Sequence, residues 1–416
     1  MIRNCIIRVS LIASCVMLLI VSFACEREEP LSSNERKDLI IETRNDAFVE
    51  KGKDFSFNLL REYYSINNDG FVVSPLSLEL VLGMINYGAQ GESSNEICSV
   101  LGYGSYEKEN VAEYAKSLSS QLVELDKSTL LYSANCVSIS DKYHFTDYYS
   151  KGANDFYSAD ALELNFTDVL SAKKAINEKI KKKTHSKIPN ALNDLNSGVE
   201  AIFLNAVYFE GRWSSKFDSK LTKEQPFITE NGNIRRVKLM NQKHDFMYYK
   251  SESFATAFLP YGNGAFNMVI ALPDEGSSVE SIIKEMDSKK WNEIISKAQV
   301  KELDLFIPKF KIEYTNDNLI PLMSNLGIES IFNDTADLTL IADGFNNNIS
   351  QIDQSILLNV DESGTKATII TKAISGLILN DIIPRTITFR ADHPFVYFIM
   401  ERSTGIIILE GVYSGA

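Results

Sequence analysis

The spacing of apolar side chains predicts a series of helices from about residue 39 onward. Asp46–Tyr64 repeats large apolar side chains at helical intervals. Ser74 followed by Pro75 is typical of a helix start, with the serine as N-cap and the proline in the first turn. That second helix is expected to end in the glycine-containing run 88–91. Further helices are expected over Ser171–Lys183 and Ser278–Ile295.

Runs of apolar and β-branched residues predict long strands between these helices. Strands are expected over Leu130–Ile139, Ala201–Tyr208, Leu303–Tyr314, Gln351–Asp361 and most of Arg385–Val412, and Phe227–Pro273 is strand-rich. No internal repeat, low-complexity linker or second tether interrupts the chain after residue 39. We therefore expect one continuous domain over residues 39–416, of mixed α+β class with long sheets.

The segment 362–375 has the most informative pattern in the chain. After Gly364 it is rich in β-branched residues, lacks proline and carries Lys366 and Lys372 as its only charges. The two lysines have the same parity, so in a strand they share one face. The other face carries uncharged and mostly small residues (Thr365, Ala367, Ile369, Thr371, Ala373 and Ser375). The pattern favours a strand suited to burial in a sheet, followed by an exposed apolar loop over 376–384.

The first 24 residues have the pattern of a secretory signal peptide. Arg3 and Arg8 give a basic start, and Val9–Phe23 is an uncharged apolar run too short for an ordinary membrane span. The run ends in Ser-Phe-Ala-Cys, which resembles a bacterial lipoprotein cleavage box with Cys25 as the lipidated residue. A plain secretory signal with an incidental cysteine is the alternative.

Residues 25–38 form an acidic and polar tether after the signal peptide. Glu26, Glu28 and Glu29 beside the cysteine resemble a surface-export signal of Bacteroidetes-type lipoproteins. We therefore expect a bacterial outer-membrane lipoprotein that faces the cell exterior and contacts the membrane through lipid on Cys25. A position on the periplasmic face is the alternative.

Charge and cysteine content restrict the partners of the domain. The formal net charge of −13 disfavours nucleic acid, which needs a basic surface. Cys98 and Cys136 are the cysteines left after the signal peptide and the lipid site, and both stand in apolar surroundings. Buried free thiols are expected, with a single disulfide as the alternative. Five lysines at 179, 181, 182, 183 and 187 favour a solvated helix face over a polyanion site.

The chain offers no recognised catalytic or metal-binding motif. Its histidines are His144, His185, His244 and His393, and none has a serine, cysteine or metal-ligand partner at a recognised spacing. Phosphate-binding glycine loops are missing too, and Gly262-Asn263-Gly264 indicates a turn. We expect no catalytic residues, no metal and no cofactor.

Several motifs in order resemble the serpin family from about residue 40 to the C-terminus. Val73–Ser77 resembles the segment that opens a buried helix of the family, and Asn205–Trp213 resembles the pattern around its tryptophan, with Phe217, Thr222 and Phe227 following. Ile307–Phe310 begins another similar segment, which continues through 326–328 and 336–338. Phe389–Phe395 is similar to the C-terminal serpin signature.

The resemblance implies eight or nine helices around three β-sheets, with an exposed reactive-centre loop at about 364–385. It implies a suicide-substrate mechanism, in which a target protease cleaves the loop and forms an acyl-enzyme. The freed part of the loop then inserts into the large sheet and distorts the protease. It assigns the hinge of that movement to Glu362, Gly364, Thr365, Ala367, Ile369 and Thr371.

Two further groups of residues are similar to family positions. Trp213, Lys309 and Glu362 match the site where the loop meets the top of the large sheet, often called the breach. Ser74, Ser77 and Asn205 match the polar cluster beneath the strands that must part, often called the shutter. The family usually adds a histidine to that cluster, and this chain has Gln354 there, whose amide can donate a hydrogen bond as a neutral imidazole does.

Counting from Gly364 by the family's spacing places the cleaved bond at Ile378–Leu379. The loop is somewhat long, so Leu377–Ile378 and Leu379–Asn380 stay open as alternatives. Because no lysine or arginine lies between residues 373 and 384, the expected partner is an elastase-, chymotrypsin- or subtilisin-like serine protease, held covalently by a monomeric inhibitor. The alternatives are a non-inhibitory surface binding protein and an inhibitor of papain-like cysteine proteases.

Overall fold

The computed structural model describes residues 34–42, 45–104, 106–195, 198–316, 318–345, 347–364 and 386–415. Arg36–Ala416 form one compact unit, separate from Met1–Glu35. The predicted signal peptide, Cys25, most of the predicted tether and the predicted loop after Gly364 lie outside the described residues. Within the described ranges, no helix combines the length and apolarity that a bilayer crossing requires.

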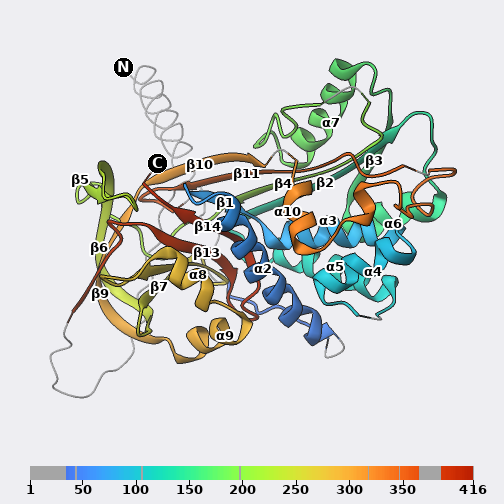
Figure 1. The fold of residues 1–416 in the computed structure, drawn as a ribbon. Helices are drawn as coiled ribbons and strands as arrows, with labels where there is room; N and C mark the ends of the chain where they lie inside the picture. Colours follow the sequence, from blue (N-terminus) through green and yellow to red (C-terminus); the bar gives the residue numbers. More distant parts are fainter. Residues whose placement is uncertain are drawn as a thin grey trace, which may run out of the picture. The chain divides into compact units, whose positions relative to one another are not determined.

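Nine α-helices and one 3₁₀ turn lie within the described residues (Figure 1). They are α2 Asp46–Ile66, α3 Pro75–Gly88, α4 Gly91–Leu101, α5 Lys108–Leu122, α6 Asp147–Tyr157, α7 Val169–Lys183, α8 Val279–Glu285, α9 Ser288–Lys297, α10 Ile320–Leu326 and η3 Ser330–Phe332. The two predicted starts at residues 46 and 75 are confirmed, and the Ser74 hydroxyl accepts a hydrogen bond from the Ser77 amide as an N-cap.

The single helix predicted over Ser278–Ile295 is wrong in one respect, because the segment contains two helices. α8 ends at Glu285, and Met286 has an extended backbone. Asp287 then caps α9 by accepting a hydrogen bond from the Lys290 amide at 2.7 Å. A capping aspartate in a continuous helical pattern therefore marks a helix start.

The strands form two sheets, one with nine strands and one with five. They are β1 Phe71–Val73, β2 Leu130–Ser140, β3 Ala159–Leu164, β4 Ala201–Glu210, β5 Lys223–Ile228, β6 Ile234–Lys250, β7 Phe254–Tyr261, β8 Phe266–Pro273, β9 Gln299–Pro308, β10 Phe310–Asn316, β11 Gln351–Val360, β12 Ile387–Arg390, β13 Phe395–Glu401 and β14 Ile407–Tyr413. The larger sheet has the order β1-β14-β13-β8-β7-β6-β9-β12, with β5 paired to β6, and the smaller has the order β10-β11-β4-β2-β3.

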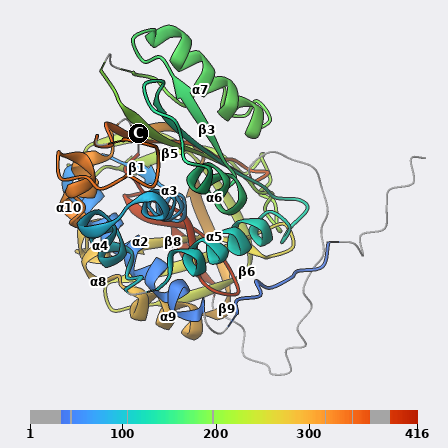
Figure 2. The same cartoon turned by 90° about the vertical axis from the view of Figure 1, so that its right-hand side faces the viewer.

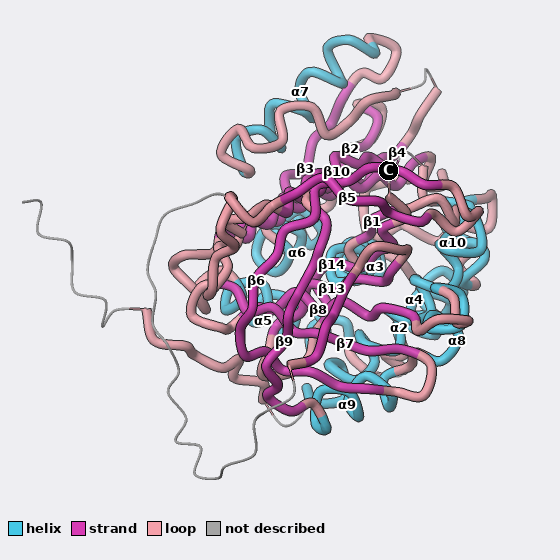
Figure 3. The backbone as a smooth tube through the Cα atoms, turned by 90° about the vertical axis from the view of Figure 1, so that its left-hand side faces the viewer, coloured by secondary structure: helices cyan, strands magenta, loops and turns pink. Residues whose placement is uncertain are grey.

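Hydrogen-bond connectivity gives two sheets where the resemblance implied three, because β6 is long enough to belong to two of them. Its first residues pair with β5, its middle with β9 and its last four with β7. Figure 3 shows β6 and β9 running beside each other at this junction. The family's two smaller sheets are thus continuous through one strand.

The extended segment predicted over Leu303–Tyr314 also divides, here between the two sheets. β9 ends at Pro308 in the nine-stranded sheet, and β10 begins at Phe310 in the five-stranded sheet. The Lys309 amide between them donates to the Lys238 carbonyl at 2.7 Å. Lys309 therefore stands at the point where the sheets meet.

One face of the five-stranded sheet packs on the main core, and the other face is covered over β2, β3 and β4 by the cluster that includes α7. Along β4, Phe203, Val207 and Phe209 pack into the main core, whereas Ile202 and Leu204 pack into a second cluster with α7. α3, whose residues are all buried, contacts β4 on the main-core side, and α5 and α6 pack against α3 (Figure 2). Part of the outer face near β10 and β11 therefore stays accessible to solvent.

Candidate functional site

A tight turn after β11 holds the start of the predicted loop against the end of β4. Asp361 and Gly364 exchange backbone hydrogen bonds of 3.0 and 3.1 Å, and the Trp213 amide donates to the Ser363 carbonyl at 3.2 Å. Gly364 has φ +102°, and a Cβ there would lie 2.3 Å from the Trp213 nitrogen. Only glycine fits this conformation and this close approach.

Glu362 anchors the same turn through its side chain and its carbonyl. One carboxylate oxygen lies 2.7 Å from Lys309 Nζ, and the other accepts from the Thr222 hydroxyl at 2.9 Å. The Phe217 amide donates to the Glu362 carbonyl at 3.0 Å. Burial alone would raise the pKa of Glu362, but the hydrogen bonds from Lys309 and Thr222 outweigh it and hold that pKa below its usual value.

Trp213 also holds the Asp361–Gly364 turn in place. Its indole Nε1 donates to the Asp361 carbonyl at 2.8 Å, and its ring stacks on Tyr261 with centroids 4.4 Å apart. The three residues predicted for the breach thus lie around the Asp361–Gly364 turn, and their part in loop insertion stays a prediction. The sequence did not predict Tyr261 as a partner, because nothing in its neighbourhood signals more than a turn.

Ser74 and Gln354 form one half of the buried polar cluster. The Ser74 amide donates to Gln354 Oε1 at 2.9 Å, and Gln354 Nε2 donates to the Ser74 carbonyl at 3.1 Å. The Ser74 hydroxyl donates to the Ile408 carbonyl of β14 at 2.6 Å. Both side chains are fully buried, so Gln354 makes two hydrogen bonds across the helix–sheet boundary.

Ser77 and Asn205 form the other half of the cluster. The Ser77 hydroxyl donates to Asn205 Oδ1, and Asn205 Nδ2 donates to Ser133 at 3.1 Å and Asn135 at 2.6 Å. Ser133 and Asn135 lie on β2 and were not predicted as members. Their only signal in the sequence is polarity within an otherwise apolar strand.

Gln354→Leu should destabilise the described state, because the Ser74 amide then loses its partner in a dry interior. The expected loss in the free energy of unfolding is about 1–3 kcal/mol. Urea denaturation followed by tryptophan fluorescence measures this change. An unchanged midpoint with an unchanged slope would show that the cluster does not hold β11 on α3.

β4 and β11 pair directly above this cluster, with no strand between them. The ladder is parallel and runs from Ile202 opposite Gln351 to Tyr208 opposite Leu357. Asn205 and Gln354 are register partners in this ladder. The polar cluster therefore lies under the parallel β4–β11 boundary, beside the turn from which the loop starts.

The lysine-rich region of α7 combines exposed side chains with ion pairs to the sheet. Lys179 and Lys183 contact the two carboxylate oxygens of Asp160 on β3 at 3.5 and 3.2 Å. Lys187 contacts Glu210 on β4 at 2.8 Å. Lys179, Lys181 and Lys182 are exposed, which agrees with the predicted solvated face, and the ion pairs add contacts from this region to the sheet.

The other predictions concern the two cysteines, a possible metal site and the residues of the loop. Cys98 is partly buried and Cys136 buried, and both are free thiols, so the disulfide alternative is wrong. No cluster of residues able to hold a metal lies within the described ranges. The predicted loop residues Thr365, Ala367, Ile369, Thr371, Leu377, Ile378, Leu379 and Asn380 lie outside the described residues.

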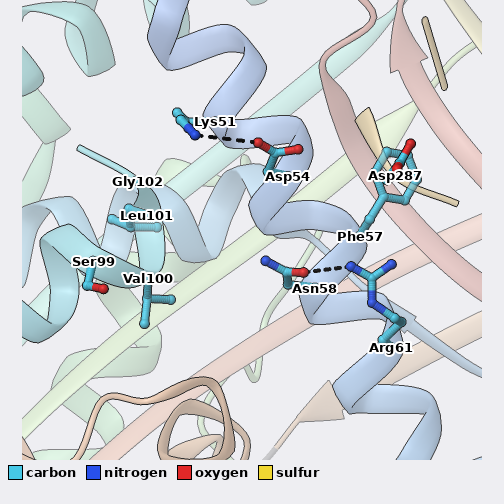
Figure 4. Close-up of a pocket in the computed structure, with 10 residues that line it drawn as sticks. All are labelled: Lys51, Asp54, Phe57, Asn58, Arg61, Ser99, Val100, Leu101, Gly102 and Asp287. Atoms are coloured by element: carbon cyan, nitrogen blue, oxygen red, sulfur yellow. Dashed lines mark hydrogen bonds and ion pairs between the residues drawn. The ribbon is translucent and has the colours of Figure 1, made fainter. Parts of the chain in front are cut away.

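A polar pocket lies on a different part of the domain from the loop anchor. It has a volume of about 250 Å³ and lies between α2, the end of α4 and Asp287 (Figure 4). Lys51 and Asp54 form an ion pair in it at 3.7 Å, and Arg61 donates to Asn58 Oδ1 at 2.6 Å. Lys51 and Asp54 are thus paired with each other, and Arg61 is held by Asn58 and the Met286 carbonyl. None of the lining residues belongs to the turn at Gly364 or to the polar cluster.

Comparisons with known proteins agree over most of the chain. The family model described as Serpin (serine protease inhibitor) matches residues 50–414. The chain is 32% identical to Serine protease inhibitor 42Dd of Drosophila melanogaster, over 82% of this chain and 90% of that protein. It is 29% identical to the leukocyte elastase inhibitor of Sus scrofa, over 86% and 96%. The fold is similar to the crystal structure of a thermophilic serpin, tengpin, in the native state, with a TM-score of 0.80 and 26% sequence identity. The match covers 92% of this chain and 97% of the tengpin chain.

Proposed function

Because the chain belongs to the serpin family, we propose that it is a suicide-substrate inhibitor of serine proteases with apolar specificity. The protease would cleave the loop after Gly364, and the acyl-enzyme would be trapped when the freed loop enters the five-stranded sheet. The alternative within the family is a serpin-fold binding protein whose loop does not insert.

The observation that carries this proposal is the direct parallel pairing of β4 with β11 beside the Gly364 turn. A strand that leaves β11 through this turn runs antiparallel to β11. Placed between β11 and β4, it is antiparallel to both of them. Insertion therefore replaces one parallel ladder by two antiparallel ladders, which are slightly more stable per residue.

The energetics favour insertion once the loop is cut. Each added backbone hydrogen bond contributes about 1 kcal/mol net. A strand as long as 365–375 would therefore gain on the order of 10 kcal/mol, comparable with the stability of a whole domain. The described state is then a kinetic trap, held by its barrier rather than by its free energy.

The side-chain pattern of the loop supports insertion. In the inserted strand, Lys366 and Lys372 stay on the solvent face, and Thr365, Ala367 and Thr371 face inward. Ile369 also faces inward and needs more room than the small residues beside it, so we expect it to slow insertion. The outward-facing Ile370 costs little.

The proposed reactive bond is Ile378–Leu379, which suits proteases with apolar pockets. The decisive experiment incubates the protein with elastase, chymotrypsin, subtilisin, trypsin and papain and looks for complexes that survive denaturant. The mass of the released C-terminal peptide identifies the cleaved bond. Clean cleavage by every enzyme, with full residual protease activity, would establish the binding-protein alternative, and a complex with papain alone would establish cysteine proteases as targets.

We also propose that Cys25 carries lipid and holds the protein at the outer membrane, facing the exterior. Cys25→Ala should move the protein from the membrane fraction to the soluble fraction. Protease digestion of intact cells separates the two faces, since only an exterior domain is accessible. Unchanged membrane association of the variant would refute the anchor.

A further inference from the structure

Glu79 is an acidic residue in the apolar interior between α2, α3 and α5. It lies on α3 and is buried, with 7% of its surface exposed, and one carboxylate oxygen accepts a hydrogen bond from the Tyr103 hydroxyl at 2.9 Å. The other oxygen faces the backbone of α2, where a Cβ on Gly52 would lie 3.0 Å away. The small cavity beside the carboxyl has room for about one water molecule.

Among the residues that the structure describes, no positively charged side chain faces this carboxyl. The titratable groups that face it are Tyr103 after α4, Tyr114 on α5 and Tyr157 on α6, all neutral at physiological pH. Lys53 on the neighbouring turn of α2 is bound instead to Glu50 and Asn292. The Tyr157 hydroxyl also lines the cavity and is buried without a partner within the described structure.

An ionised carboxylate in such a place is costly, so its proton affinity rises. Burial raises the pKa of Glu79 to about 7, and the hydrogen bond from Tyr103 offsets only part of that effect. The group therefore changes charge in the physiological range, although nothing in the inhibitory mechanism uses it.

The position of Glu79 couples it to the polar cluster under the sheet. Ser74 and Ser77, in the first turn of the same helix, hold Gln354 of β11 and Asn205 of β4. Glu79 lies just after them, where α3 contacts α5 and α6. A change in the packing of this stretch of α3 therefore acts on the helix that supports the β4–β11 boundary.

We propose that Glu79 is a proton-operated brake on this boundary. With its carboxyl protonated, α3 stays packed against α5 and the sheet stays closed. With the carboxyl ionised, the buried charge favours opening of the α3–α5–α6 cluster to water. This pH-dependent opening is a property of the protein without any protease, so it goes beyond the proposed function. Only the effect of the opening on how long the protein stays an active inhibitor rests on that function.

The sign follows from the two protonation states. In an opened state the carboxyl is solvated and has its ordinary pKa near 4.5, whereas in the closed state the pKa is about 7. The closed state is therefore favoured fully below pH 4.5, loses stability as the pH rises to about 7, and stays at the lower level above it. Between pH 5 and pH 8 the opening equilibrium should increase roughly tenfold to a hundredfold.

The test is amide hydrogen exchange of α5 in the full-length protein from pH 5 to pH 8, expressed as protection factors so that intrinsic rates cancel. The wild type should lose protection by the factor given above. Glu79→Gln keeps the acceptor for Tyr103 and removes the charge, and its protection should stay constant within about threefold. Glu124→Gln, an exposed position just after α5, is the matched control and should follow the wild type.

A wild-type profile that is flat, or an E79Q profile that follows the wild type, would overturn the proposal. If E79Q does not fold, Tyr103→Phe gives a second test, because loss of the donor should move the midpoint to higher pH, and an unmoved midpoint would count against Glu79. These measurements use no protease, so they succeed or fail independently of the inhibition assay.

Discussion

Thr365→Arg should turn the protein from an inhibitor into an ordinary substrate, which proteases cleave and from which they are then released in active form. Thr365 is the first residue after the Gly364 turn and faces inward in the proposed inserted strand. Insertion would then bury a guanidinium without a partner, at a cost of several kcal/mol. A cost of about 3 kcal/mol slows insertion more than a hundredfold. Hydrolysis of the acyl-enzyme then becomes faster than insertion of the loop.

Thr368→Arg is the matched control for this prediction, because it makes the same change on the solvent-facing side of the strand. It should retain inhibition, since an arginine there resembles the neighbouring lysines. The measurement is the ratio of covalent complex to cleaved protein after reaction with elastase or chymotrypsin. Equal ratios for the two variants would refute the assigned faces, and complex formation by Thr365→Arg would refute insertion from the first residue.

Gly364→Ala should shorten the lifetime of the uncleaved protein. The turn holds residue 364 at φ +102°, with a Cβ position only 2.5 Å from the Gly211 carbonyl oxygen. Alanine would strain this turn by about 1–3 kcal/mol, and its Cβ would push the loop away from Trp213. The same residue in an inserted strand has an extended backbone, which alanine adopts without strain. The substitution therefore penalises the described state alone.

The expected result is faster spontaneous loss of inhibitory activity on incubation, together with a gain in heat resistance as the loop inserts uncleaved. Residual activity and the thermal midpoint, followed over the same time course, measure both effects. Ser363→Ala changes the neighbouring residue, which has no positive φ, and should behave as the wild type. Equal lifetimes for all three proteins would mean that the turn does not restrain the loop.

Local signals in the sequence predicted much of the fold. The Ser74 cap and Pro75 gave the start of α3 because both act through backbone geometry within a few residues. The family motifs located Trp213, Lys309 and Glu362, which the structure gathers around one turn, with Lys309 bound to Glu362 and Trp213 bound to the Asp361 carbonyl. The positions of these residues follow from long-range pairing, which only the resemblance made available.

What the sequence did not predict depends on contacts between distant segments. The division of 303–314 into β9 and β10 arises because the Lys309 amide bonds to Lys238, far away in the chain. Glu79 looks like one polar residue in an apolar helix, and its burial is decided by Tyr103 and by α5. Periodicity describes which face a residue occupies, but not what another element places against it.

The ion pairs of the α7 region determine how the five-stranded sheet can divide. Lys183, the last residue of α7, forms an ion pair with β3, and Lys187, just after α7, forms one with β4. This segment therefore joins the two strands on either side of β2. The remaining strands, β10 and β11, are joined to these three strands through the β4–β11 ladder. These ion pairs do not cross the β4–β11 boundary, which lies beside the turn at Gly364, so a pull on the loop acts on this boundary before the boundaries between β3, β2 and β4.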